Sequence, residues 1–278
     1  MNFSNKRILI TGGAGSIGSE LVRQLAPKNK IFIFDIDETR GFDLSEELKQ
    51  KGYWVEFRLG DIRDINSVRD LFSDFKPEMV FHASALKHVS INEKYPLEAI
   101  QTNIIGTYNV LSEVDRWACC KKFIFISTDK VISSNSIMGA TKKIGEIMTK
   151  NKGHIAVRFG NVMGSRGSVI PIWQRQINEG GPFNITDSRM ERFMITIPQA
   201  VELVIKASEM PSDGRIVILD MGNPVNVLEL AKGIIGASGK DINIREIGIR
   251  DGETLDEKLM TLEEEKVVIK EDNFYIIH

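Results

Sequence analysis

Short runs of apolar, often β-branched residues alternate with amphipathic stretches through the first part of the chain. The apolar runs predict buried strands at residues 7–11, 31–34, 54–57, 79–82, 123–126 and 155–159. Between them, apolar residues recur at three- and four-residue steps, which predicts helices at residues 16–25, 65–75, 96–117 and 138–150. Continuous apolar strands separated by helices indicate a parallel sheet covered on both faces. We therefore expect an α/β fold with a doubly wound, Rossmann-type parallel sheet.

The pattern changes beyond Asn161, where glycines and prolines break the alternation and the elements become shorter. Further helices are predicted at residues 198–208, with Pro198 in the first turn, and at 226–237. A last strand is predicted at residues 274–277. We expect a sheet domain over residues 1–160 and a smaller C-terminal lobe, packed on the sheet edge, over residues 161–278.

Composition narrows the class of protein. The 278 residues are 42% hydrophobic and 27% charged, which is typical of a globular chain and excludes disordered, collagen-like and cysteine-stapled proteins. The net charge of −2 gives no broad positive field, so we expect neither nucleic acid nor a membrane surface as a partner.

Cysteine usage and hydropathy indicate the compartment. Cys119 and Cys120 are adjacent, a spacing that suits neither a disulfide framework nor a metal site, and no metal is expected. No run of about 18 apolar residues is present, so no membrane segment is predicted. The first apolar segment runs straight into a glycine loop and leaves no room for a signal peptide. These features together predict a reduced, cytoplasmic protein.

A glycine-rich loop, Thr11-Gly12-Gly13-Ala14-Gly15-Ser16-Ile17-Gly18, follows the first predicted strand and opens the first helix. In that context Gly12 permits a tight turn, Gly15 lets the backbone approach a pyrophosphate, and Gly18 lets the helix pack closely on the sheet. The helix N-terminus, with Ser16 and Ile17, offers free N–H groups to phosphates. The loop predicts dinucleotide binding, against the alternative of a merely structural turn.

Acidic residues at the ends of the next strands bear on the choice of cofactor. Asp35 ends the second strand, where a carboxylate hydrogen-bonds ribose hydroxyls and repels a 2′-phosphate, so NAD is favoured over NADP. Arg40 lies close enough in sequence to accept a 2′-phosphate and counts against that preference. Asp61 is placed to meet the adenine amine, or alternatively to cap the next helix.

Several longer motifs resemble one family over nearly the whole chain. They are the glycine loop, His82-Ala83-Ser84-Ala85-Leu86-Lys87-His88-Val89, Ser127-Thr128-Asp129-Lys130, Met138-Gly139-Ala140-Thr141-Lys142, Arg158-Phe159-Gly160-Asn161-Val162, Gly164-Ser165-Arg166-Gly167-Ser168-Val169-Ile170-Pro171 and Arg192-Phe193-Met194-Ile195-Thr196-Ile197. The chain resembles an extended short-chain dehydrogenase/reductase, in the branch of the UDP-N-acetylglucosamine 4,6-dehydratases of bacterial polysaccharide biosynthesis. The resemblance implies NAD as cofactor, a UDP-sugar as substrate, an NAD-binding domain over residues 1–160 and a nucleotide-sugar-binding lobe over 161–278.

A 4,6-dehydratase oxidises C4 of the sugar, removes water across C5 and C6, and returns the hydride to C6. The elimination needs an acid and a base side by side. The resemblance implies that Asp129 is the acid, Lys130 the C5 base, Thr128 a hydrogen-bond partner of the 4-hydroxyl and Lys142 a ligand of the nicotinamide ribose. These roles require a protonated Asp129 and a neutral Lys130, so we expect both pKa values to be displaced. The alternative is a capped loop that carries two solvated charges.

Three features depart from the family pattern. Met138 stands where most of the superfamily carries a catalytic Tyr, although the larger membrane-anchored members of the branch resemble this chain in having Met there. A thioether accepts no proton, so the group that deprotonates the C4 hydroxyl is left open between Asp129 and an ordered water. The N-terminal membrane helices of those members are not found here. Finally, the usual Pro-Gly-Glu-Lys motif reads Asp251-Gly252-Glu253-Thr254.

Further ligands of the nucleotides are expected around this centre. Arg192 and Arg250 are candidates for the substrate phosphates, since guanidinium binds phosphate bidentately, and Glu253 for the nucleotide ribose. Asn103 is interpreted as holding local backbone. The remaining candidates are Ile62, Ala83 and Ala85 for the cofactor, Lys87 for cofactor and sugar, and Asn161, Ser168 and Val169 for the diphosphate and base.

The resemblance also implies a homodimer or higher homo-oligomer, formed through the apolar faces of the helices at 97–117 and 138–150. Two other functions are kept open. A nucleotide-sugar epimerase uses the same pocket, but the Asp129-Lys130 pair argues against it. A catalytically inactive dinucleotide-binding regulator is the non-enzyme alternative, and the joint presence of Thr128, Asp129, Lys130 and Lys142 argues against that.

Overall fold

The computed structural model describes residues 4–133 and 135–278 of the chain. Its centre is a nine-stranded sheet of order β14-β15-β11-β6-β5-β4-β1-β2-β3. Seven of these strands are parallel, and the hairpin of β14 and β15 closes one edge antiparallel to β11. The strands are β1 (Arg7–Thr11), β2 (Lys30–Asp35), β3 (Val55–Leu59), β4 (Met79–His82), β5 (Lys122–Ile126), β6 (Ile155–Arg158), β11 (Ile216–Leu219), β14 (Ile269–Glu271) and β15 (Phe274–Ile277). The predicted doubly wound α/β fold is confirmed.

Two layers of helices cover the sheet, as the alternation of buried residues along the strands requires. Ile8 and Ile10 pack in one core with α1 (Ser16–Leu25), α2 (Glu38–Gln50) and α9 (Ile197–Ser208). Leu9 points the other way and packs with α3 (Ile65–Phe75), α6 (Thr107–Arg116) and α7 (Ile137–Asn151). Chain order reverses between β1 and β4, so the carboxyl ends of these strands form the crevice in which such sheets bind ligands.

The predicted helix at 96–117 consists of three pieces: α5 (Pro96–Ile100), a π-helical segment η2 (Gln101–Gly106) and α6. Asn103, inside the π segment, accepts from the Leu86 N–H at 2.8 Å and donates to the Leu86 carbonyl at 3.0 Å. The interpretation that Asn103 holds local backbone is confirmed. The helix α2 was not predicted, because few of its positions are buried and its apolar face is narrow.

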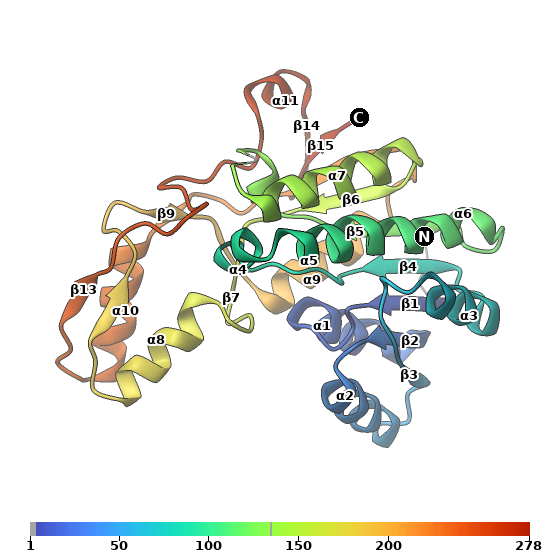
Figure 1. Cartoon of the computed structure of the whole chain (residues 1–278), viewed down its shortest axis with the longest axis horizontal. Helices are drawn as coiled ribbons and strands as arrows, with labels where there is room; N and C mark the ends of the chain where they lie inside the picture. Colours follow the sequence, from blue (N-terminus) through green and yellow to red (C-terminus); the bar gives the residue numbers. More distant parts are fainter. Residues whose placement is uncertain (1–3, 134) are drawn as a thin grey trace.

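Short elements make up the rest of the described chain. Near the sheet they are η1 (Ala26–Lys28), α4 (Val89–Lys94), η3 (Asp129–Val131) and α11 (Leu262–Val267). In the second lobe they are β7 (Asn161–Met163), α8 (Val169–Asn178), β8 (Phe183–Ile185), β9 (Glu191–Arg192), β10 (Met194–Thr196), β12 (Val225–Asn226), α10 (Val227–Ser238) and β13 (Ile244–Glu246). Figure 1 shows α8, α10 and β13 together at the left of the sheet, and α11 above it.

The second lobe has a small core of its own around Trp173, Phe183 and Ala231. The chain beyond residue 160 does not belong to that lobe alone. The helix α9 and strands β11, β14 and β15 return to the large sheet, and Phe274 and Ile276 join its core. The last predicted strand is therefore part of the main sheet, where it covers the edge of β11, and not part of the lobe. The second lobe begins near residue 160, but later elements of the chain also belong to the large sheet.

No described helix is both long enough and apolar enough to cross a bilayer. Cys119 and Cys120 are free thiols. Within residues 4–133 and 135–278, no group of three or more His, Cys, Asp or Glu side chains is arranged to hold a metal ion.

Candidate active site

A cavity of about 1300 Å³ lies at the carboxyl ends of β1 to β6 and extends to the second lobe. Every candidate site residue named from the sequence lines it. From the sheet side these are Gly12, Gly15, Ser16, Ile17, Gly18, Asp35, Arg40, Asp61, Ile62, Ala83, Ala85, Lys87, Thr128, Asp129, Lys130, Met138 and Lys142. From the later part of the chain they are Asn161, Ser168, Val169, Arg192, Arg250 and Glu253.

The glycine loop forms one end of this cavity. Gly12 has a φ of 67°, and a Cβ there would lie 2.5 Å from the Ser84 nitrogen, so only glycine fits. The helix α1 begins at Ser16 after Gly15, and no described side chain caps it. Its first N–H groups therefore remain available to an anion in the cavity. This loop fits the phosphates of a dinucleotide.

Asp35 is fixed at the end of β2 by backbone donors. Its Oδ2 accepts from the Ala14 N–H at 2.9 Å, and its Oδ1 accepts from the Asp37 N–H at 3.0 Å. Arg40 is paired with the Asp37 carboxylate at 2.8 Å rather than with Asp35. This arrangement holds Asp35 at the end of β2, where a ribose is expected to bind, and pairs Arg40 with Asp37.

Arg166 is a residue of this end that the sequence analysis missed. Its N–H donates to Ser16 Oγ at 3.0 Å, and its guanidinium donates to the Ala14 carbonyl. It thereby fastens the loop after β7 to the glycine loop, across 150 residues of sequence. Its position inside the Gly164–Pro171 motif was the only signal in the sequence.

Asp61 lies after β3 and forms an ion pair with Arg63 at 2.7 Å. Burial alone would raise the pKa of Asp61, but hydrogen bonds from Arg63 lower it overall. The cap of α3 is Asp64, whose side chain accepts from the Asn66 N–H, so the alternative of Asp61 as that cap is wrong. Ile62 follows on the cavity wall and packs against the position of Gly106.

The centre of the cavity holds Thr128, Asp129 and Lys130, which follow β5 on the short helix η3. Thr128 Oγ1 donates to Asp129 Oδ1 at 2.9 Å. Lys130 Nζ lies 3.0 Å from Asp129 Oδ1, 3.1 Å from Asn161 Oδ1 and 2.8 Å from Glu257 Oε1. The Asp129 side chain is 0% exposed and that of Lys130 is 24% exposed, so the alternative of two solvated charges is wrong.

The protonation states differ from those expected from the sequence. Burial would raise the pKa of Asp129, but Lys130 and three hydrogen bonds outweigh it and lower the pKa. Burial would lower the pKa of Lys130, but the charges of Asp129 and Glu257 raise it. Asp129 is therefore a carboxylate and Lys130 an ammonium in this structure. The attraction between Asp129 and Lys130 accounts for most of the difference, and Glu257, which is far away in sequence, adds to it.

Glu257 is the second residue that the sequence analysis missed. It lies on the segment between the second lobe and α11, and its Oε1 also lies 3.5 Å from Arg192 Nε. Burial raises the pKa of Glu257 to about 7, with Asp129 adding to the rise and Lys130 opposing it. No local motif signals Glu257, because its contact with Lys130 joins two residues that are far apart in the sequence.

Arg192 and Arg250 occupy different environments. Arg192 is buried, and its guanidinium donates to the carbonyls of Glu191, Thr254 and Leu255, each at 2.7 Å. These hydrogen bonds hold the segment before Glu257 in place. A contact between Arg192 and a phosphate would be additional to them. The Arg250 side chain is 51% exposed, and its contact with Glu253 is long, at 4.0 Å. Its guanidinium is therefore accessible to a ligand in the cavity.

Met138 and Lys142 lie on one face of α7, one turn apart, and both are buried. Lys142 Nζ lies 3.9 Å from the centre of the Phe125 ring. Burial lowers the pKa of Lys142 to about 7, and Glu146 opposes this shift. Met138 contributes an apolar wall to the cavity, as a thioether must.

Two loops that line the cavity, one after β4 and one after β7, contact each other. Lys87 Nζ lies 3.4 Å from Ser165 Oγ, and burial lowers its pKa with help from Arg166 and Lys130. Ser168 precedes α8, and Val169 is its first residue; no described side chain caps this helix either. A second uncapped helix N-terminus therefore lines the cavity.

Comparison with known proteins agrees with this arrangement. Residues 8–278 match the family described as polysaccharide biosynthesis protein. The capsular polysaccharide biosynthesis protein CapD of Staphylococcus aureus is 42% identical over 94% of this chain, which spans only 46% of that protein. A UDP-glucose 4-epimerase of Rickettsia bellii is 37% identical over 99% of this chain and 83% of that protein. An inverting UDP-N-acetylglucosamine 4,6-dehydratase of Campylobacter jejuni is 34% identical over the same shares, 99% and 83%.

Solved structures give the same result for the fold. Pen from Bacillus thuringiensis superposes with a TM-score of 0.94 at 36% identity, covering 100% of this chain and 89% of that one. The UDP-glucose 4-epimerase of Thermus thermophilus, in complex with NAD, has a TM-score of 0.79 at 24% identity over 92% and 91% of the two chains. On the family match, the glycine loop and the shared fold, the chain belongs to the polysaccharide biosynthesis protein family of extended short-chain dehydrogenases/reductases.

Proposed function

We propose that the protein is an NAD-dependent nucleotide-sugar 4,6-dehydratase, a lyase that converts UDP-N-acetylglucosamine to a UDP-4-keto-6-deoxy sugar. The observation that carries the proposal is the buried Asp129-Lys130 pair, with their polar atoms 3.0 Å apart, at the centre of the cavity. Oxidation at C4 alone needs no such pair, whereas loss of water across C5 and C6 needs an acid and a base together.

The cofactor end is assigned to the glycine loop. The uncapped start of α1 would hold the pyrophosphate of NAD, Asp35 the adenosine ribose, Asp61 the adenine and Lys142 the nicotinamide ribose. Ile62, Ala83, Ala85 and Lys87 complete the walls of this end. NAD supplies the hydride acceptor for C4 and the hydride donor for C6. Binding of NAD by structural relatives such as the Thermus enzyme supports this assignment.

The pair reaches its working state by one proton transfer. Moving a proton from Lys130 Nζ to Asp129 Oδ1, along their 3.0 Å hydrogen bond, gives a neutral amine and a carboxylic acid without changing the number of protons. Lys130 then takes the C5 proton while Asp129 protonates the departing C6 hydroxyl, which leaves as water. The proton on Lys130 afterwards returns to C5, and the proton released from the 4-hydroxyl when C4 is oxidised passes to the pair, directly or through an ordered water, so that its starting protonation is restored. Thr128, whose Oγ1 donates to Asp129 Oδ1, would accept a hydrogen bond from the 4-hydroxyl.

The nucleotide of the substrate is assigned to the second lobe. The uncapped N-terminus of α8, with Ser168 and Val169, and the free guanidinium of Arg250 would bind the diphosphate. Glu253 would bind the ribose, and Asn161 and Lys87 would lie on the sugar side. Arg192 supports this end by fixing the backbone at Thr254 and Leu255.

We also propose a homodimer formed by the helices on one face of the sheet. Apolar side chains are exposed along α5, the π segment, α6 and α7, and water is a poor environment for such a row. They are Leu97, Ile105, Tyr108, Ile144 and Ile147. Sedimentation of the parent protein and of Tyr108→Glu measures this: we expect the substitution to shift a dimer toward a monomer.

A nucleotide-sugar 4-epimerase is the second candidate, because the Rickettsia relative named as such is as similar to this chain as the dehydratase relative. Incubation with NAD and UDP-N-acetylglucosamine, followed by chromatography that resolves epimeric nucleotide sugars and by mass spectrometry of each peak, separates the candidates. A dehydratase gives a product that has lost one water, an epimerase gives a product of unchanged mass, and a regulator gives no product. Loss of water is the result that we expect.

A further inference from the structure

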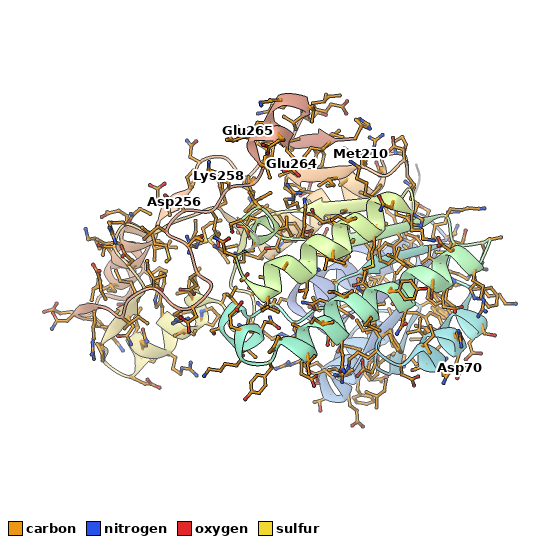
Figure 2. The ribbon with its side chains drawn as sticks, turned by 45° about the horizontal axis from the view of Figure 1, so that its top comes forward. Asp70, Met210, Asp256, Lys258, Glu264 and Glu265 are labelled. Atoms are coloured by element: carbon orange, nitrogen blue, oxygen red, sulfur yellow. The ribbon has the colours of Figure 1, made fainter. Side chains whose placement is uncertain are left out.

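Glu257 lies at the centre of the cavity without a role in the proposed chemistry. Figure 2 labels its neighbours Asp256 and Lys258 on the segment that leads from the second lobe toward Glu264 of α11. Glu257 Oε1 lies 2.8 Å from Lys130 Nζ, and the Glu257 side chain is only 7% exposed. Two carboxylates, Asp129 and Glu257, thus bind the same ammonium group inside the protein.

The acceptor atoms of this cluster are not all satisfied. Asp129 Oδ2 is buried and has no hydrogen-bond partner among the described residues. The Glu257 carboxyl lies beside the Asp129 carboxyl, because Glu257 Oε1 and Asp129 Oδ1 contact the same Lys130 Nζ, at 2.8 and 3.0 Å. Two carboxylates cannot hydrogen-bond each other, since both only accept, but a carboxylic acid donates to a carboxylate. The arrangement is that of a carboxyl pair that holds one proton.

We propose that Glu257 is a positioning residue that acts in its protonated form, donating a hydrogen bond to Asp129 and releasing Lys130 from a second negative charge. This inference rests on the proposed dehydratase function, since it concerns the base and acid of that elimination. It goes beyond that function by assigning a third group, on another part of the fold, that sets the protonation of the pair.

The charges around the cluster explain why the protonated form matters. With Glu257 ionised, two carboxylates hold Lys130 as an ammonium, and an ammonium takes no proton from C5. With Glu257 protonated, only Asp129 remains charged, and transfer of the Lys130 proton to Asp129 turns an ion pair into two neutral groups. The other charged groups that face the cluster are Arg192, 3.5 Å from Glu257, and Lys87, whose charge acts on Lys130 from the opposite loop.

The position of the proton predicts a pH dependence. Burial raises the pKa of Glu257 to about 7, so its acid form is present below that pH and is lost above it. The elimination step should therefore slow as the pH rises through this range. Glutamine has nearly the same shape as a protonated glutamate and cannot ionise, so it reproduces the acid form at every pH.

The first test measures kcat and KM for UDP-N-acetylglucosamine against pH in the parent, Glu257→Gln and Glu257→Ala. We expect the alkaline fall in kcat to disappear in Glu257→Gln, with kcat above that of the parent at alkaline pH. Glu257→Ala also removes the charge but holds neither Asp129 nor Lys130 in place, so this loss of positioning should lower kcat at least about tenfold at neutral pH with a smaller change in KM. Glu265→Gln is the matched control, because this exposed carboxylate on α11 lies outside the cavity, and its profile should follow the parent. A Glu257→Gln variant with less than a tenth of the parental kcat at neutral pH, or with the parental alkaline limb, overturns the proposal.

The second test needs no activity. Infrared difference spectra of the parent between acid and alkaline pH should show the C=O band of a protonated carboxyl that disappears near pH 7, and Glu257→Gln should lack that step. A parent without such a step overturns the proposal, whatever its activity. If the parent shows the infrared step near pH 7 but releases no dehydrated sugar, the proposed function is refuted, while the proton shared by Glu257 and Asp129 is supported. Failure of the proposed function can therefore be distinguished from failure of this inference.

Discussion

Arg158 gives the sharpest prediction of stability. It lies on β6 with its side chain 0% exposed, and donates to Glu146 Oε1 at 3.0 Å and Glu146 Oε2 at 2.8 Å. On its other side it donates to both oxygens of Glu264, at 2.8 and 3.0 Å, and to the Leu259 carbonyl at 2.9 Å. One guanidinium therefore connects the sheet, α7 and the segment that carries Glu257.

We expect Arg158→Met to lower the free energy of unfolding by about 3–5 kcal/mol, the cost of leaving a buried carboxylate without its partner. Glu146 is 0% exposed and would keep only Ser127 Oγ at 2.7 Å and Lys143 at 3.5 Å. Glu264 is less affected, because it is 14% exposed and has Lys143 within 3.7 Å. Removing the charge of Glu146 as well, in Arg158→Met/Glu146→Leu, should recover part of the loss, since an apolar pair replaces a buried ion pair at little cost.

Urea unfolding, followed by circular dichroism, measures these differences as shifts of the midpoint. Arg58→Met is the matched control. Its ion pair with Asp74 lies at the surface, with side chains 31% and 68% exposed, and such pairs contribute at most about 1 kcal/mol. The reasoning is refuted if Arg158→Met unfolds no more easily than Arg58→Met, or if the double variant is less stable than Arg158→Met alone.

Three further predictions concern the cavity. Asp35→Ser should raise affinity for NADP relative to NAD in fluorescence titrations; a parent that binds NADP more tightly contradicts the role of Asp35. Met138→Ala should retain measurable turnover without a Tyr at this position, because the thioether only packs; a folded, NAD-binding variant without turnover would show otherwise. Burial lowers the pKa of Lys142 from 10.5 to about 7, so between these values the unfolded chain binds a proton that the folded chain does not, and stability should rise with pH. The urea midpoint of Lys142→Met should not rise with pH in this range. An equal rise in the variant and the parent would contradict the lowered pKa of Lys142.

Features that depend on local sequence could be predicted well. The strands were visible as apolar runs, and the glycine loop was visible because its spacing must fit one backbone geometry at the start of α1. Asp129 and Lys130 were found because they follow β5 at the edge where parallel sheets bind ligands. The helix α2 was missed because its buried face is narrow, and the π segment at Gln101–Gly106 was predicted as part of one α-helix because apolar spacing does not distinguish a short π segment from the helix around it.

Features that depend on distant contacts could not be predicted. Strand β15 had the composition of any buried strand, and only its pairing with β11 places it in the main sheet. The protonation of Asp129 and Lys130 was expected in the opposite sense, because the sequence shows neither how closely the two side chains pair nor that Glu257 adds a second carboxylate beside Lys130. Titration depends on the charges within a few ångströms, and these come from segments that the sequence keeps far apart.

The exchange of one hydrogen at C5 tests the central claim most directly. The protein is incubated with NAD and UDP-N-acetylglucosamine in deuterated water, and the product is examined by mass spectrometry and proton NMR. We expect a product that has lost one water and carries one deuterium at C5. Lys130→Ala should fold and bind NAD, but should form this product about 10²–10⁴-fold more slowly, as loss of a general base requires. A product with all its oxygen atoms and no deuterium, or an unchanged rate in Lys130→Ala, would contradict the account.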